Sequence, residues 1–286
     1  MTYRTARAAM ITGAALTLCA CVGGGGSIYS TPPAPIAPPT PTPTPMATPF
    51  GVTSDTQFPT VGDKVDIRWN SSAQTYEIRL SEKDWKRLTL GYTNSTVDEH
   101  YPASGLYGVR IQKDLPYAYT KYATVFENGW GAILDEFAFG LPTATGDVPK
   151  TGSASYDAKV WGTGTGAGAV AGSGTYYDVT GMAKLSFDFG AGSLSGYMTT
   201  TLTGPTGIFT TPRYDFTQTV YAAGSTTFSG NFIVPGSSED AYFSGQFNGP
   251  QAAELMASWR APFADPTAPN GPLWGTMRGV WIGKKD

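Results

Sequence analysis

The chain has 286 residues, with 36 glycines, 22 prolines and 13% aromatic residues, but only 14% charged residues and a formal net charge of −3. It carries two cysteines, at positions 19 and 21, and one histidine, His100. Metal sites with several His or Cys ligands, iron–sulfur clusters and Cys–His nucleophile pairs are therefore excluded within one chain. The acidic balance argues against a nucleic-acid partner, because nucleic-acid-binding domains usually have a basic face.

Residues 1–20 are predicted to be a lipoprotein signal peptide. A short basic region is followed by an apolar run that is too short to span a membrane as a helix. The sequence Leu18-Cys19-Ala20-Cys21 resembles a bacterial lipobox, which predicts cleavage after Ala20 and acylation, including palmitate, at Cys21. Such a lipid anchor would hold the protein on a membrane, and Val22 after the cysteine fits sorting to the outer membrane. The alternative is an ordinary secretory signal with incidental cysteines.

Residues 21–50 are predicted to form a tether. Four glycines follow Val22, and nine prolines alternate with small residues between Thr31 and Pro49. This composition is typical of a flexible joint followed by a semi-rigid polyproline II spacer. Cleavage before Cys21 leaves no second cysteine, so the folded region is expected to contain no disulfide.

Residues 51–286 are predicted to be all-β. Apolar and polar residues alternate at period two in residues 65–69, 76–80 and 87–92. Similar short segments, separated by Gly-, Pro- and Ser-rich turns, follow at 154–161, 174–179, 183–189, 194–202, 214–222, 227–232, 241–247 and 276–283. The nearest approach to a helix is residues 250–259, which could form one or two turns. This pattern favours an antiparallel barrel or sandwich.

Two adjacent predicted strands contain the same unit, Phe-Ser-Gly-x-Phe. It appears at residues 228–232 and 243–247, with a looser copy in Leu194-Ser-Gly-Tyr197. In a strand, both Phe rings and the central glycine (Gly230 or Gly245) share one face, where the glycine admits a neighbouring ring. We expect these rings to fill a core; an aromatic cage for a ligand is the alternative.

From Phe137 onward the sequence resembles the β-barrel domain of transferrin-binding protein B and related surface lipoproteins. The resemblance is carried by Phe137-Ala-Phe-Gly-Leu-Pro-Thr143 with residues 148–156, by residues 183–196, and by Phe243-Ser-Gly-Gln-Phe-Asn-Gly-Pro-Gln-Ala-Ala-Glu254 with a closing strand at 279–285. It implies a β-rich handle domain at 51–136 and an eight-stranded antiparallel β-barrel at 137–286. The bulky residues after Glu254 depart from the family pattern.

The resemblance also implies a surface-displayed binding protein, exported with the help of an outer-membrane translocon. Full transferrin-binding proteins have two handle–barrel pairs, whereas this chain has room for one, so transferrin binding is not carried over.

Six residues are candidate contacts for a ligand or partner. In the polar segment Asp98-Glu-His-Tyr101, His100 could ligate haem iron, and Tyr101 or Tyr107 could supply a phenolate, although a solvated histidine is the alternative. The segment 116–122 is expected to expose Tyr117, Tyr119 and Tyr122 as a partner-contact patch, unless these rings pack at a strand edge.

We interpret two further features as structural rather than functional. Glu254, if buried, needs donors, for which Arg260 and Arg278 are candidates. Residues 162–169 match a dinucleotide fingerprint only superficially, because a strand rather than a helix follows, and a hairpin loop is expected.

The sequence thus predicts a non-enzymatic outer-membrane lipoprotein that faces the cell exterior. It would bind a host protein, a haem or iron source, or another solute, with no obligate cofactor and no metal. A structural or adhesive envelope protein without a soluble ligand is the alternative. A hydrolase that uses His100 lacks the Gly-x-Ser-x-Gly nucleophile elbow.

Overall fold

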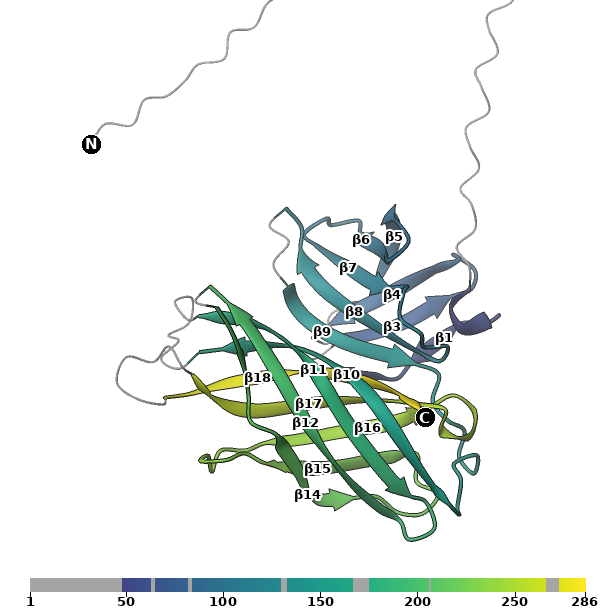
Figure 1. The fold of residues 1–286 in the computed structure, drawn as a ribbon. Coiled ribbons are helices and arrows are strands. Elements are labelled where there is room, and N and C mark those ends of the chain that lie inside the picture. Colours follow the sequence, from purple (N-terminus) through teal and green to yellow (C-terminus); the bar gives the residue numbers. More distant parts are fainter. Residues whose placement is uncertain are drawn as a thin grey trace, which may run out of the picture. The chain divides into compact units, whose positions relative to one another are not determined.

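The computed structural model describes residues 48–62, 65–81, 84–129, 133–166, 175–205, 207–265 and 273–286. The predicted signal peptide, Cys21 and the tether up to residue 47 lie outside the described residues, as do residues 167–169 of the glycine-rich segment. Everything described belongs to one compact unit, Pro45–Asp286. Strands dominate it (Figure 1), so the predicted all-β class is confirmed.

The first sheet, which we call the handle, has nine strands in the described residues. They are β1 (Thr56–Phe58), β2 (Thr60–Gly62), β3 (Val65–Asn70), β4 (Thr75–Leu80), β5 (Lys86–Thr93), β6 (Val97–Pro102), β7 (Tyr107–Gln112), β8 (Thr120–Glu127) and β9 (Ile133–Gly140). The order is β1-β3-β4-β5-β6-β7-β8-β9-β2. Strands β1 and β2 are separated only by Pro59, yet they pair with opposite ends of the sheet, β3 and β9. The short segment around this proline therefore closes the sheet on itself.

The folded region begins slightly before the predicted boundary at residue 51. A 3-10 turn, η1 (Pro49–Gly51), buries Pro49. The ring of Phe50 packs edge-on against Phe58 at 5.3 Å and against Phe139 at 6.0 Å. These contacts bury apolar surface, so the last residues assigned to the tether are part of the handle core.

The second sheet, which we call the barrel, also has nine strands in the described residues. They are β10 (Ser153–Thr165), β11 (Tyr176–Asp188), β12 (Ser193–Gly204), β13 (Gly207–Thr210), β14 (Tyr214–Val220), β15 (Thr227–Ile233), β16 (Tyr242–Asn248), β17 (Glu254–Asp265) and β18 (Leu273–Lys285). The order is β11-β10-β18-β17-β16-β15-β14-β12-β13, and an additional pairing of β11 with β12 closes the sheet. Eight strands thus close a ring, as predicted, and β13 is a short extension beside β12.

Aromatic rings fill the barrel interior, as an eight-stranded barrel requires. Gly230 lies opposite Phe243, and Phe228 lies opposite Gly245. A Cβ atom added to Gly230 would stand 2.6 Å from Phe243, and one added to Gly245 would stand 2.6 Å from Phe228. Each glycine of the repeated Phe-Ser-Gly-x-Phe unit therefore makes room for a ring on the neighbouring strand, and the expectation of core packing is confirmed.

Three sequence assignments need correction. Residues 137–140, assigned to the barrel, belong to β9 of the handle, because Phe137 and Phe139 pack into the handle core. The two strands predicted at 174–179 and 183–189 are one long strand in the described residues, β11 (Tyr176–Asp188), which continues through residues 180–182. Residues 250–259 form only a 3-10 turn, η2 (Pro250–Ala252), before β17 begins.

The dinucleotide reading of residues 162–169 is not supported. Gly162 and Gly164 lie inside β10, which is antiparallel to both of its neighbours. A dinucleotide fingerprint instead follows a parallel strand and opens a helix.

Candidate functional site

The handle packs against the outer wall of the barrel through an apolar cluster. Its fully buried members are Tyr122, Ala138, Met256, Val280 and Ile282, and Val61, Leu115, Tyr117 and Trp161 pack around them. The ring of Tyr122 on β8 stacks on that of Trp161 on β10, with centroids 4.7 Å apart and planes 16° apart. This contact joins the handle to the barrel, whose facing surfaces form the two walls of the candidate site described below.

The segment between β16 and β17 adds polar contacts between handle and barrel. Asn248 is fully buried, and its amide donates to the Thr120 hydroxyl at 3.0 Å. Gly249 has φ +72°, and its Cα faces the ring of Tyr119 so closely that an added Cβ would stand 2.3 Å from it. Only glycine combines this backbone conformation with this approach.

Glu254 completes these contacts. Its carboxylate, 2% exposed, accepts hydrogen bonds from the backbone N–H groups of Ala118 at 2.7 Å and Tyr119 at 3.0 Å. The expectation that Arg260 or Arg278 would satisfy this carboxylate is wrong, because the handle main chain supplies the donors.

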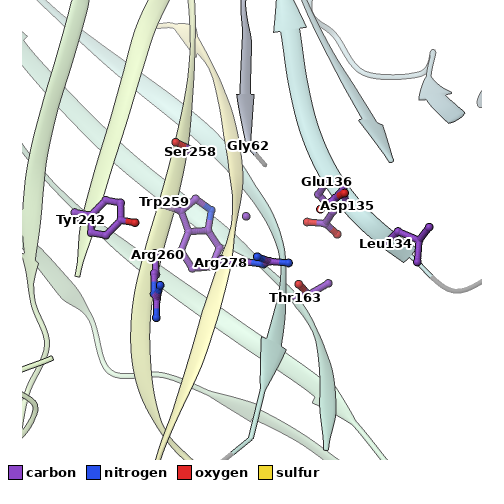
Figure 2. A pocket seen from close by; sticks show the side chains of 11 residues that line it. Gly62, Leu134, Asp135, Glu136, Thr163, Tyr242, Ser258, Trp259, Arg260 and Arg278 are labelled. Atoms are coloured by element: carbon purple, nitrogen blue, oxygen red, sulfur yellow. The ribbon is translucent and has the colours of Figure 1, made fainter. Parts of the chain in front are cut away.

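A groove lies between β9 of the handle and the outer barrel wall (Figure 2). It consists of two adjoining hollows of about 170 and 280 Å³ that share Leu134, Thr163, Arg260 and Arg278. The first hollow is also lined by Gly62, Asp135, Glu136, Tyr242, Ser258, Trp259 and Gly279, and the second by Ile133, Thr165, Tyr176 and Thr276.

Strand register determines the barrel wall of the groove. Tyr242 on β16 pairs with Arg260 on β17, Arg260 pairs with Arg278 on β18, and Arg278 pairs with Thr163 on β10. Thr163 in turn pairs with Asp178 on β11. Five polar side chains therefore form one row across five strands. Directly paired residues have Cβ atoms about 4.5–5.5 Å apart, so the two guanidinium groups start as close neighbours.

A second row lies two residues further along the same strands. Thr276 on β18 pairs with Thr165 on β10, which pairs with Tyr176 on β11. Tyr176 and Tyr242, at opposite ends of the two rows, are 63% and 47% exposed. The barrel wall of the groove thus presents hydroxyl groups and two open aromatic rings around two arginines.

The handle wall of the groove is acidic. Figure 2 shows Arg278 pointing from the barrel towards Asp135 and Glu136 on β9. One carboxylate oxygen of Glu136, Oε2, is buried and has no hydrogen-bond partner in the described part of the chain. Burial raises the pKa of Glu136 to about 7, and nearby Asp178 acts in the same direction, while the hydrogen bond with Tyr122 and the charge of Arg278 oppose the rise. The handle wall can therefore change its charge near neutral pH.

His100 does not lie in a polar loop. It is on β6, fully buried, with its ring edge-on to Tyr76 at 5.6 Å. Neither ring nitrogen has a hydrogen-bond partner among the described residues, and burial lowers the pKa of His100 to about 4, against the opposing effect of Asp98. The solvated histidine expected from the sequence is therefore wrong, and haem ligation by His100 stays a prediction.

Tyr101 and Tyr107 are half-buried in the handle. The hydroxyl of Tyr101 donates to Glu99 at 2.8 Å, and its ring is edge-on to Phe126 at 5.9 Å. Tyr107 packs against the handle core. Burial raises the pKa of both phenols, so the neutral form of each is favoured.

The three tyrosines of the expected exposed patch point inward instead. Tyr122 is 5% exposed and stacks on Trp161, Tyr119 packs against Gly249, and Tyr117 donates to the carbonyl of Ile282 at 2.9 Å. Their role in partner contact stays a prediction, but their exposure was wrongly predicted because the sequence does not show where the barrel meets the handle. None of the six predicted residues lines the groove.

The described ranges contain no group of three or more His, Cys, Asp or Glu residues that could hold a metal ion. Among the same residues, no helix has the length and apolar character needed to cross a membrane.

The groove residues Asp135, Glu136 and Thr163 were missed from sequence, and Arg260 and Arg278 were assigned a different role. A row across five strands becomes visible only when the register of every hairpin is known, and the sequence fixes no register for β17, which was not predicted. One signal in the sequence was available for the arginine pair: Arg260 and Arg278 lie at similar sequence separations on either side of the Pro/Gly-rich segment 266–272.

No protein-family model matches this chain, and no curated protein matches it at a significant level. Its fold is similar to solved structures of transferrin-binding protein B. A mutant of the Haemophilus parasuis Hp5 protein is 16% identical with a TM-score of 0.44, over 78% of this chain and 51% of that one. The isotype 1 protein from serogroup B Neisseria meningitidis is 15% identical with a TM-score of 0.44, over 82% of this chain and 43% of that one.

The chain spans about half the length of the proteins it matches.

Proposed function

We propose that this protein is a lipid-anchored binding protein of the outer membrane, displayed on the cell exterior, and that the groove between handle and barrel is its binding site. It binds a host protein, a haem or iron source, or another solute, and performs no chemistry on it. The lipobox ending in Cys21 and the tether that follows support the anchoring and reach of the folded region.

The observation that carries the proposal is the opposed chemistry of the groove walls. Two directly paired arginines, Arg260 and Arg278, face a handle strand that carries Asp135 and Glu136. Binding sites combine a concave shape with a few convergent polar groups and perturbed pKa values, and the groove has each of these features.

Transferrin is the partner named for the similar solved structures, and it is one of the host proteins to test. Because the chain spans about half their length, we place no priority on it over other host proteins.

The test is affinity capture from host fluid with the full exported protein, extracted from cell membranes, beside its Arg260→Gln variant. We expect a retained partner or solute that is lost with the variant. Arg213→Gln is the control, because Arg213 is exposed and pairs with Asp215 outside the groove. Retention of nothing by the wild type would favour the structural or adhesive alternative, and equal retention by the Arg260→Gln variant would exclude the groove.

Anchoring and display have separate tests. Globomycin should cause unprocessed precursor to accumulate, and protease added to whole cells should remove the folded region. Normal processing in globomycin would contradict the lipid anchor, and full protection from protease would contradict outward display.

A further inference from the structure

The row Tyr242–Arg260–Arg278–Thr163–Asp178 on the barrel wall has an arrangement that packing alone does not explain. Like charges directly opposite one another on paired strands destabilise a sheet, yet Arg260 and Arg278 are such a pair. Arg260 has no ion pair or hydrogen bond with any described residue, and its side chain is exposed. Arg278 already has an interaction and points towards Asp135 and Glu136 of the handle (Figure 2), so Arg260 is the arginine of the pair whose charge has no counter-charge among the described residues. A carboxylate between the two guanidinium groups would supply that counter-charge, because guanidinium binds carboxylates through two parallel hydrogen bonds.

The groups around the arginines indicate what carries the anion. Hydroxyl groups of Thr163, Thr165 and Thr276 stand beside the arginine pair, and those of Ser258 and Tyr242 border the same groove. Across the groove, the carboxyl groups of Asp135 and Glu136 line the first hollow; Asp135 already has an interaction, and a carboxylate can accept further hydrogen bonds. A ligand with one anionic group and several hydroxyl groups would use both walls, because its hydroxyls can donate to the carboxyl oxygens and accept from the threonines.

The size of the hollows and the exposed aromatic rings narrow the class of ligand further. Hollows of about 170 and 280 Å³ are smaller than most sites for drug-sized ligands, which span about 300–1,000 Å³. They suit a single sugar ring and its substituents. Each hollow has one exposed ring at its border, Tyr242 in the first and Tyr176 in the second, and such a ring offers a flat apolar face beside a polar tip, which suits the mixed surface of a pyranose.

We propose that the groove binds an acidic saccharide unit, with its carboxylate between Arg260 and Arg278 and its ring hydroxyls directed to Asp135, Glu136 and Thr163. This inference rests on the proposed function and specifies its ligand: a uronic-acid type of sugar, free or at the end of a glycan chain. The site recognises the carboxylated ring itself, so the rest of a glycan or glycoprotein would extend out of the groove.

The test is a titration of the full protein with D-glucuronate, followed by saturation-transfer difference NMR and calorimetry. D-glucose has the same ring without the carboxylate, and acetate has the carboxylate without the ring. We expect D-glucuronate to bind with a Kd of about 1 mM, which corresponds to about 4 kcal/mol, and each of the other two compounds to bind at least tenfold more weakly.

Variants test the residues. Arg260→Gln is expected to weaken D-glucuronate binding at least tenfold, because charge-assisted hydrogen bonds are the strong ones. Arg260→Lys should recover only part of the loss, since lysine keeps the charge but not the two-pronged geometry. Arg213→Gln should stay within twofold of the wild type. Circular dichroism would check that the three variants, all at exposed positions, remain folded.

Each contrary result overturns the proposal in a defined way. If D-glucose bound as tightly as D-glucuronate, the arginine pair would have no part in recognition. If acetate bound as tightly as D-glucuronate, the groove would be a simple anion site. No saturation transfer from D-glucuronate, or equal effects of Arg260→Gln and Arg213→Gln, would rule out the saccharide site altogether. A partner captured from host fluid in the absence of D-glucuronate binding would leave the proposed function standing and overturn only its ligand class.

Discussion

The Glu254 carboxylate of the barrel accepts a 2.7 Å hydrogen bond from the backbone N–H of Ala118 in the handle. A second bond, from Tyr119 at 3.0 Å, completes the coordination of this buried charge. Because main-chain groups of one sheet satisfy a side chain of the other, neither the connection 113–119 nor the start of β17 can shift without leaving a buried charge unpaired. Such losses cost more than the net value of an ordinary hydrogen bond.

Substitution of Glu254 should therefore destabilise the whole folded unit. We expect Glu254→Gln to lower the free energy of unfolding by about 2 kcal/mol, because the bonds lose their charge assistance, and Glu254→Ala by about 3 kcal/mol. Urea unfolding followed by tryptophan fluorescence measures both. Glu239→Gln, at an exposed position in a turn, is the control and should change stability by less than about 0.5 kcal/mol. Equal effects of Glu254→Gln and Glu239→Gln would contradict the role of Glu254.

The glycines of the Phe-Ser-Gly-x-Phe units should not tolerate a methyl group. In Gly245→Ala the new Cβ would stand 2.6 Å from Phe228 and 2.5 Å from the carbonyl oxygen of Met256. We expect a loss of about 2 kcal/mol from overpacking. Gly190→Ala is the matched control, because its nearest neighbour, an oxygen of Asp188, would be at 3.5 Å.

A double variant separates ring contact from backbone contact at this position. If the Phe228 ring contributes to the clash, Gly245→Ala combined with Phe228→Leu should cost less than the sum of the single changes, since neighbouring residues are not additive. Strict additivity, measured by thermal unfolding, would assign the whole effect to the Met256 carbonyl and to the Cβ of Ala257, which would also stand 2.6 Å from the new methyl group.

His100 should make the protein less stable in acid. Its pKa is about 4 in the folded state and 6.5 ordinarily, because burial disfavours the charged ring. The unfolded state therefore takes up the proton first, and stability is lost as pH falls from about 6.5 to about 4, by about 3 kcal/mol in total.

His100→Leu tests this contribution. The variant should be close to the wild type at pH 7, since the imidazole nitrogens have no partners in the described residues to lose. Unfolding measured between pH 4 and pH 7 should show a flatter profile. An unchanged loss on acidification would show that other groups dominate, whereas a large loss at pH 7 would show that His100 has a structural partner.

Glu136 should act in the opposite direction over the same range. Its pKa is about 7 in the folded state and 4.5 ordinarily, so the folded state holds its proton more tightly. The stability that results is fully present below about pH 4.5 and is lost as pH rises through about 7. Glu136→Gln mimics the protonated acid and should stabilise the protein at pH 8 by about 2 kcal/mol, while leaving it nearly unchanged at pH 4.5.

The groups that face Glu136 from the packed elements are Tyr122, Asp178 and Arg278. Asp178→Asn is the companion variant, because it removes only the like charge that raises the pKa. It should lower the pKa of Glu136 and weaken the alkaline loss partly, as followed by carboxyl NMR titration. A Glu136→Gln profile that runs parallel to the wild type would contradict this account.

The strands that the sequence predicted correctly are those with one solvent-facing side. In β3, for example, buried Val65, Ile67 and Trp69 alternate with half-buried polar residues, so the period-two signal is clean. The eight-stranded ring was predicted from a family resemblance together with the spacing of such segments, and the pairing of Phe rings with glycines followed from the repeated unit.

Strand β17 was missed because apolar residues lie on both of its faces near its start. Leu255, Ala257 and Trp259 point into the barrel core, while Met256, on the outer face, is buried under the handle. This removes the alternation, and Ala, Leu, Met and Glu are all good helix formers. The contact between handle and barrel also explains why the tyrosines were wrongly predicted to be exposed. Tyr122 is buried by stacking on Trp161, a residue 39 positions further along the chain that no local sequence pattern connects to it.

The last strand, β18, imposes an order on how the chain can acquire its structure. It pairs with β10 and so seals the barrel, and its outward residues Val280 and Ile282 form part of the surface that receives the handle. A chain that folds from its N-terminal end would leave the edges of β10 and β17 unpaired, and Tyr122 partly uncovered, until the thirteen residues of β18 were in place. Removal of β18 alone should therefore leave an aggregation-prone chain without a smaller folded barrel, so this one strand limits the completion of both the barrel and the surface that receives the handle.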